Sequence, residues 1–232
     1  MKLTDQHIEQ LYKFTRQHFV EHYDVQTELV DHLANDIEQI WKENPTLTFE
    51  QARDNSFKKF GVFGFMNVVE EKQKQMNKKY IKIIWSYLKQ WFTLPKIILT
   101  VSSVFIFYFL FQIPYYGKYF FYSLEVFFFL FIIIRCQFLI KQQKQRVIET
   151  GKNWLLEDII FKMASSNFIV FFCNVYNIFR LAELMHRKEF TFLISVFSVL
   201  LILVSYITLE LIPKKSEELL EEQYPEYKFA NN

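Results

Sequence analysis

The sequence predicts an all-α membrane protein, in which an N-terminal cytoplasmic domain of about four helices is joined by a long stalk helix to a four-helix transmembrane bundle. The chain is 51% hydrophobic, and its 28 Phe among 232 residues are well above ordinary usage. The apolar residues are segregated. Residues 1–96 are rich in Lys, Glu and Gln, whereas 97–140 and 167–212 carry long apolar runs. A soluble core does not need this segregation, so two environments are indicated.

The change in composition near Pro95 sets the expected domains. We expect a cytoplasmic helical domain and stalk at 1–92, a transmembrane domain at 93–212 and a cytoplasmic tail at 213–232. The tail starts with two lysines and then becomes acidic, which predicts a short helix that ends before Pro225.

The first helices are marked by caps. Leu3 and Ile8 flank Thr4 as a hydrophobic staple flanks an N-cap, so the first helix starts there and runs to about Val20. A second apolar stripe predicts a helix from about Asp24 to Lys42. In TFEQA, residues 48–52, the spacing of Thr and Gln is that of a capping box, and this third helix is expected to end at Gly61.

The stalk is predicted from an apolar repeat that continues from Phe65 to Trp91. Trp85, Tyr87 and Trp91 stand among lysines, as is typical of the membrane interface, where an aromatic ring can be half buried.

Four segments are expected to span the membrane. The run IILTVSSVFIFYFLFQI holds no charge and nearly covers a hydrocarbon core of roughly 30 Å at about 1.5 Å per residue. Pro114 and Gly117 in the following turn predict a hairpin with the next span. The expected spans are about 97–113, 119–140, 167–185 and 191–212.

The distribution of Lys and Arg predicts the orientation, because cytoplasmic loops carry an excess of both. Twelve flanking basic residues lie on one side of a four-span chain and three on the other: Lys78, Lys79, Lys82, Lys89, Lys96, Lys141, Lys144, Arg146, Lys152, Lys162, Lys214 and Lys215, against Lys118, Arg187 and Lys188. The first ten residues also lack the apolar stretch of a secretory signal. We therefore expect a multi-pass protein of the bacterial inner membrane with both termini in the cytoplasm.

Charged residues within the apolar segments form two expected pairs. Glu125 and Arg180 each lie roughly 9 Å from the outer end of their spans by helical rise, and Arg135 and Glu210 are similarly placed on the inner side. We favour ion pairs between helices. The alternative is a polar path for a proton or solute through Glu125, Arg180 and Glu183.

The stretch ELVDHLANDIE, residues 28–38, raises the question of a metal site. Glu28 and His32 share a helix face, and His18 and His22 have the same spacing on the preceding segment. The pattern lacks the Glu-x-x-His pairs of a di-iron bundle and is not His-Glu-x-x-His. We interpret Glu28 and His32 as an ion pair or hydrogen bond within one helix, and expect no metal and no other cofactor.

Several protein classes are excluded or disfavoured. A net charge of +2 without a reading motif gives no reason to expect nucleic-acid binding. Cys136 and Cys173 fall inside apolar segments, where no basic group would stabilise a thiolate, and no phosphate-binding loop is present. We expect the chain not to be an enzyme.

The N-terminal part resembles the HAAS domain, a small helical module of bacterial membrane proteins associated with PadR-type transcriptional regulators and permease-like partners. The resemblance covers about residues 4–76 and is carried by Glu28, His32 and Leu33 in ELVDHL, by TFEQA at 48–52 and by KKFG at 58–61. It implies a signalling or partner-docking domain on a membrane anchor, and implies no reaction.

The function expected from the sequence is therefore that of a regulatory or accessory subunit of a membrane complex. Its expected partners are the lipid bilayer and a protein, either a regulator or another membrane subunit, and self-association stays open because lipid also satisfies the apolar surface. The alternative is a small transporter or channel subunit that uses Glu125, Arg180 and Glu183.

Overall fold

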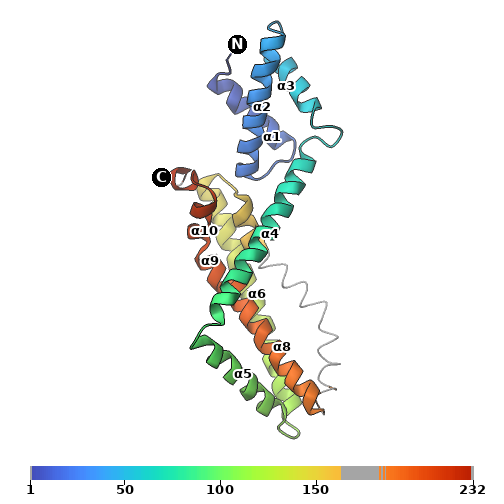
Figure 1. The fold of residues 1–232 in the computed structure, drawn as a ribbon, viewed down its shortest axis with the longest axis vertical. Helices are drawn as coiled ribbons and strands as arrows, with labels where there is room; N and C mark the ends of the chain where they lie inside the picture. Colours follow the sequence, from blue (N-terminus) through green and yellow to red (C-terminus); the bar gives the residue numbers. More distant parts are fainter. Residues whose placement is uncertain (1, 163–182, 184, 186, 231–232) are drawn as a thin grey trace. The chain divides into compact units, whose positions relative to one another are not determined.

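The computed structural model describes residues 2–162, 183, 185 and 187–230, which form helices and turns without a β-strand among them (Figure 1). The all-α prediction is thus confirmed. The chain divides into two compact units. Unit 1 comprises Met1–Lys78 and Gly151–Leu156, and unit 2 comprises Lys79–Thr150 and Glu157–Asn232.

Unit 1 is built on three helices and the start of a fourth. These are α1 (Asp5–Gln17), α2 (Tyr23–Glu43), α3 (Phe49–Lys58) and the first half of α4 (Met66–Trp91). Thr4 caps α1 and Thr48 caps α3, as expected, and a capping box is present at Thr4 as well as at Thr48, where it was predicted. The first helix stops three residues before Val20, because Phe19 adopts a positive φ of 63° that a helix cannot contain.

The core of unit 1 lies where α2 packs against α1 and α3. Leu11 of α1, Leu29, Leu33 and Ile37 of α2, and Ala52 of α3 are all 0% exposed. These positions recur at the helical period, so one face of α2 is buried along its length. Between α2 and α3, the Trp41 indole donates to the Leu47 carbonyl at 3.1 Å.

The turn between α3 and α4 depends on two glycines. Gly61 and Gly64 have φ of +79° and +55°, a left-handed conformation that other residues rarely adopt. A Cβ at Gly64 would lie 2.8 Å from the Phe57 ring. This close approach lets the turn fold back, and Phe65 then stacks edge-on against Phe57 at 4.8 Å.

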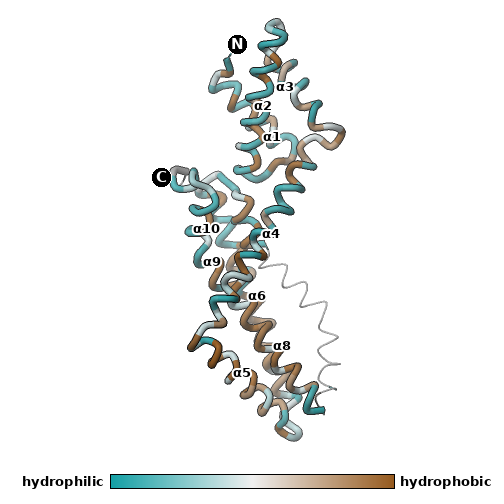
Figure 2. The backbone as a smooth tube through the Cα atoms, in the orientation of Figure 1, coloured by the Kyte–Doolittle hydropathy of each residue, from teal (hydrophilic) through white to brown (hydrophobic). Residues whose placement is uncertain are grey.

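Unit 2 contains the apolar helices and the C-terminal segment. Its elements are the second half of α4, α5 (Lys96–Phe111), α6 (Gly117–Thr150), residues 157–162 of a helix at 155–162, α8 (Lys188–Tyr206), the π-helix η1 (Ile207–Leu211), α9 (Ile212–Lys214), α10 (Ser216–Gln223) and α11 (Tyr227–Ala230). Figure 2 shows hydrophobic residues concentrated along α5, α6 and α8. The α5–α6 hairpin packs on α8 through Phe111, Phe121 and Ile194.

Two helical stretches in the described residues are long and apolar enough to cross a membrane, namely Gly117–Thr150 and Lys188–Lys214. A third is reached if α4 and α5 count as one span, although they are bent by 87° relative to each other. The length and composition of these helices indicate a membrane protein. The expected spans 119–140 and 191–212 fall inside the two long helices.

The other two expected spans, 97–113 and 167–185, do not correspond to membrane-length helices in the described residues. Segment 97–113 corresponds to α5, whose 16 residues extend only about 24 Å, short of a hydrocarbon core of roughly 30 Å. Apart from Glu183 and Met185, segment 167–185 lies outside the described residues.

The last apolar helix contains a π-turn that the sequence analysis did not predict. The Ile212 amide donates to the Ile207 carbonyl, five residues back. Pro213 follows, and proline has no N–H with which to continue the ladder of i to i−4 hydrogen bonds. The helix widens at this point, which is also the position of Glu210.

Candidate functional site: a buried acidic pair

The helix at 155–162 is buried along nearly its whole length. Every residue from Trp154, just before the helix, to Phe161 is at most 4% exposed, and this run includes Glu157 and Asp158 at 3% each. Two adjacent carboxylates among apolar side chains carry a large desolvation cost, so they need charged or hydrogen-bonding partners. This buried acidic pair is the most unusual polar feature in the described part of the chain.

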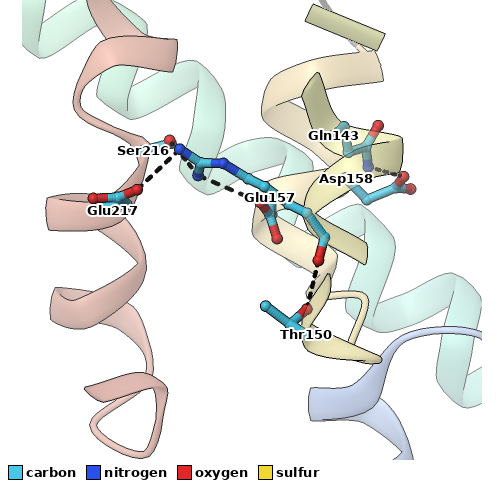
Figure 3. A network of polar contacts seen from close by, with 7 residues as sticks. Gln143, Thr150, Glu157, Asp158, Ser216 and Glu217 are labelled. Carbon is cyan, nitrogen blue, oxygen red and sulfur yellow. Dashed lines mark hydrogen bonds and ion pairs between the residues drawn. The ribbon is translucent and has the colours of Figure 1, made fainter. Parts of the chain in front are cut away.

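Arg146 of α6 is the basic partner of Glu157. Its Nη1 lies 3.6 Å from Glu157 Oε1, close enough for charge attraction but too far for a hydrogen bond. Its Nη2 donates to Glu217 Oε1 at 2.9 Å, and Nη1 lies 3.5 Å from Ser216 Oγ (Figure 3). One guanidinium therefore joins α6, the 155–162 helix and α10.

Asp158 has closer partners than Glu157. Gln143 Nε2, on α6, donates to its Oδ1 at 2.8 Å (Figure 3). Lys162 Nζ lies 2.6 Å from its Oδ2. Gln143 is itself buried, so this hydrogen bond is shielded from competing water.

The two carboxyls thus differ in their environments. Burial raises the pKa of Glu157 above its usual range, and the charge of Arg146 only partly opposes this effect. The negative charges of Asp158 and Glu217 act in the same direction as burial. Glu157 is therefore the member of the pair whose charge is most weakly stabilised.

The N-terminal end of the same helix is held within unit 1. The Leu155 amide donates to Asp24 Oδ1 at 3.0 Å, and the Tyr23 amide donates to the Asn153 carbonyl at 2.7 Å. The Trp154 and Tyr23 rings meet edge to face at 5.2 Å. Residues 154–156 thus belong to the packing of unit 1, while Glu157 and the residues after it belong to unit 2.

The four residues considered for a metal are not gathered into a site. His32 Nε2 lies 4.0 Å from Glu28 Oε1, and Lys72 Nζ lies 2.7 Å from Glu28 Oε2. The His18 ring packs on Phe57 at 4.5 Å, and His22 is the N-cap residue of α2. Across the described residues, no three His, Cys, Asp or Glu side chains come close enough to share a metal ion.

The charges within the apolar helices are placed as follows. Arg135 of α6 forms an ion pair with Glu210 of η1, and Lys214 Nζ lies 3.1 Å from the other oxygen of Glu210. Glu125 is half-buried on α6. Arg180, its expected partner, lies outside the described residues, and Glu183 is exposed.

The buried acidic pair was not predicted from the sequence, because the segment between the second and third expected spans was considered only for its flanking basic residues. The segment WLLEDIIF could have indicated a buried acidic pair, because its two acids are enclosed by six apolar residues. An amphipathic surface helix would place its charges on one side of an apolar stripe. A helix that is apolar on every side is expected to be buried, and its charges with it.

Comparison with protein family models, curated proteins and solved structures gives no match for this chain. The chemistry of the sites described above is therefore the ground for a functional proposal.

Proposed function

We propose that the chain is a non-enzymatic, multi-pass protein of the bacterial cytoplasmic membrane that acts as a signalling or partner-docking subunit. In this proposal unit 1 is a cytoplasmic module that binds a regulator protein. The response passes to the membrane-spanning unit along two helices. The resemblance of residues 4–76 to the HAAS domain supports a regulator as the partner.

The proposed topology has four spans, with both termini in the cytoplasm. The two long apolar helices supply two of them, and 97–113 and 167–185 supply the others. The twelve-to-three bias of flanking Lys and Arg supports this orientation, because an odd number of crossings would place a basic tail outside.

One observation carries the coupling part of the proposal: two helices run unbroken from one unit into the other. Helix α4 passes from unit 1 to unit 2 between Lys78 and Lys79, and the 155–162 helix does so between Leu156 and Glu157. A helix is stiff over a few turns, so a displacement at one end is carried to the other. In the 155–162 helix the displacement would reach Glu157 within one turn.

The docking surface we propose is the apolar loop, defined as Val62 and Phe63 between α3 and α4 together with Met66, the first residue of α4. Their exposed fractions are 99%, 66% and 64%, although large apolar side chains are usually covered. The flanking charges are of both signs, with Lys58 and Lys59 before the loop and Glu70 and Glu71 after it. An apolar centre with a mixed polar rim fits a protein partner, whereas an anionic membrane surface favours a basic rim.

The test compares partners of the full-length protein purified from native membranes in mild detergent. We expect a cytosolic protein to co-purify in a fixed ratio with the wild type and to be lost with Val62→Asp/Phe63→Asp. Burying each of these side chains contributes roughly 1.5–3 kcal/mol, so the double substitution should weaken binding at least about a hundredfold. Ile148→Asp is the matched control, since Ile148 is also apolar and 83% exposed but lies on α6.

Coupling is tested on the same complex by amide hydrogen exchange. Binding at the apolar loop should change the exchange of residues 154–162. A wild-type protein that purifies alone, or a partner retained equally by both variants, would contradict the docking proposal. A bound partner that leaves exchange at 154–162 unaltered would contradict the coupling.

A further inference from the structure

A cavity of about 600 Å³ lies in unit 2 where the α5–α6 turn meets the start of α8. Its walls include four aromatic side chains, Phe111, Tyr115, Tyr119 and Tyr122. A cavity of this volume is within the range that small ligands occupy in proteins.

The turn that forms one wall has a fixed shape. The Gly117 amide donates to the Ile113 carbonyl at 2.9 Å, and Tyr115 adopts a φ of +69°. A Cβ on Gly117 would overlap the carbonyl group of Phe111, so only glycine permits this approach of the two helices. The course of the turn, and with it this wall of the cavity, thus depends on Gly117.

Cationic and hydrogen-bond-donating groups dominate the polar part of the cavity. Lys118 and Lys188 both line it, and none of the described residues that line it is Asp or Glu. Gln112 Nε2, in the same wall, is buried and has no hydrogen-bond partner among the described residues. A buried donor without an acceptor costs free energy. An anionic oxygen bound in the cavity would supply the acceptor that Gln112 Nε2 lacks.

The aromatic surroundings place this cavity at a membrane interface. Tyr115, Tyr116 and Tyr119 are 78%, 65% and 62% exposed at the end of the apolar α5–α6 hairpin. Tyrosines in such a position are typical of the headgroup level of a bilayer. The cations of the cavity are thus expected at the depth where phosphate groups lie.

We propose that this cavity is a binding site for a phosphate group. Lys118 and Lys188 pair with its charge, Gln112 Nε2 donates to one of its oxygens, and the aromatic walls contact the carbon chain attached to it. The phosphate comes either from an anionic lipid headgroup or from a soluble phosphate ester. The site is independent of the apolar loop in unit 1.

The experiment is calorimetric titration of delipidated full-length protein in a non-ionic detergent. The probes are short-chain phosphatidylglycerol, short-chain phosphatidylcholine, glycerol phosphate and inorganic phosphate. Tighter binding of phosphatidylglycerol than of the soluble phosphates identifies a lipid as the source. Equal or tighter binding of glycerol phosphate or inorganic phosphate identifies a soluble ligand. Both results support the site.

Two variants and a control decide whether the binding takes place in this cavity. Lys118→Gln/Lys188→Gln should weaken the binding about tenfold or more, because two charge-assisted contacts are lost. Lys13→Gln/Lys42→Gln removes the same charge from unit 1 and should leave the binding unchanged.

Gln112→Leu provides an independent check. It should weaken phosphate binding while leaving the melting temperature of the ligand-free protein unchanged or higher, because it removes a buried donor that lacks a partner. The proposal is overturned if no probe binds, or if Lys118→Gln/Lys188→Gln behaves as the control does.

Discussion

Replacing Arg146 with methionine tests whether Glu157 depends on a single basic partner. Methionine keeps most of the length of the arginine stem and removes its charge. Glu157, whose side chain is 4% exposed, would then be buried without Arg146, the basic side chain that lies within ion-pair distance of it in the described part of the chain. Breaking a buried ion pair in this way typically costs about 3–5 kcal/mol.

Protonation of Glu157 sets a ceiling on this cost. The carboxyl can take up a proton instead of staying charged. Protonating a carboxyl whose ordinary pKa is 4.5 costs about 1.36 kcal/mol for each unit by which the pH exceeds 4.5. At pH 7 the ceiling is about 3.4 kcal/mol, and at pH 5.5 it is about 1.4 kcal/mol. For a protein of this size these values correspond to falls in melting temperature of up to about 7–14 °C and about 3–6 °C.

The direction of the pH dependence follows from the raised pKa of Glu157. An acid with a higher pKa in the folded than in the unfolded state binds more protons when folded, so its contribution to stability is fully present below pH 4.5 and is lost as the pH rises through the folded pKa. Arg146→Met should raise the pKa of Glu157 further, so the pH range over which this contribution to stability is lost should extend to higher pH.

The assay is thermal unfolding of the purified full-length protein in detergent at pH 7 and pH 5.5. Glu217→Gln is the control, because it removes only the 69% exposed partner of Arg146 and should cost less than about 1 kcal/mol. The double variant Arg146→Met/Glu157→Gln should recover most of the stability at pH 7. A penalty that is the same at both pH values, or a double variant no more stable than Arg146→Met, would refute the reasoning.

Three further predictions concern the backbone, a cap and the core. Gly117→Ala should lower the melting temperature and open the α5–α6 turn, because its Cβ overlaps the Phe111 carbonyl; an inter-helix distance measured by spin labels that stays unchanged would contradict this. Asp24→Ala should leave the Leu155 amide without its acceptor and cost roughly 1–3 kcal/mol, seen as faster hydrogen exchange at 153–156 that Asp31→Ala does not cause. Leu33→Ala empties a position that is 0% exposed and should destabilise unit 1 by about 2–5 kcal/mol in thermal unfolding, and a loss below about 1 kcal/mol would show that the site is not tightly packed.

The helical fold of unit 1 was accessible from the sequence because its signals are local. Thr4 and Thr48 cap helices through neighbours three residues away, and the buried face of α2 repeats within a single helix. The two long apolar helices were accessible for the same reason. The π-turn also had a local signal in Pro213, but its effect on the hydrogen bonds before it was not considered.

The charged residues within the apolar segments were placed by depth alone. Helical rise gave Arg135 and Glu210 similar depths, and in the structure the two side chains form an ion pair. Depth does not fix the direction in which a side chain points around its helix. The pairing expected for Glu125 and Arg180 stays a prediction, because Arg180 lies outside the described residues.

The sequence by itself determined that this protein is helical, that its apolar residues are segregated into membrane-length segments, and that basic residues flank them, because each property depends on neighbours along the chain. Only the tertiary structure decided that Arg146 meets Glu157 and Glu217, since these residues come from three helices and Glu217 lies 71 positions away. The same holds for the cavity that brings Lys118 and Lys188 to one wall of tyrosines. Contacts of this kind depend on how helices pack, and packing is set by the combined shapes of many side chains rather than by any local pattern.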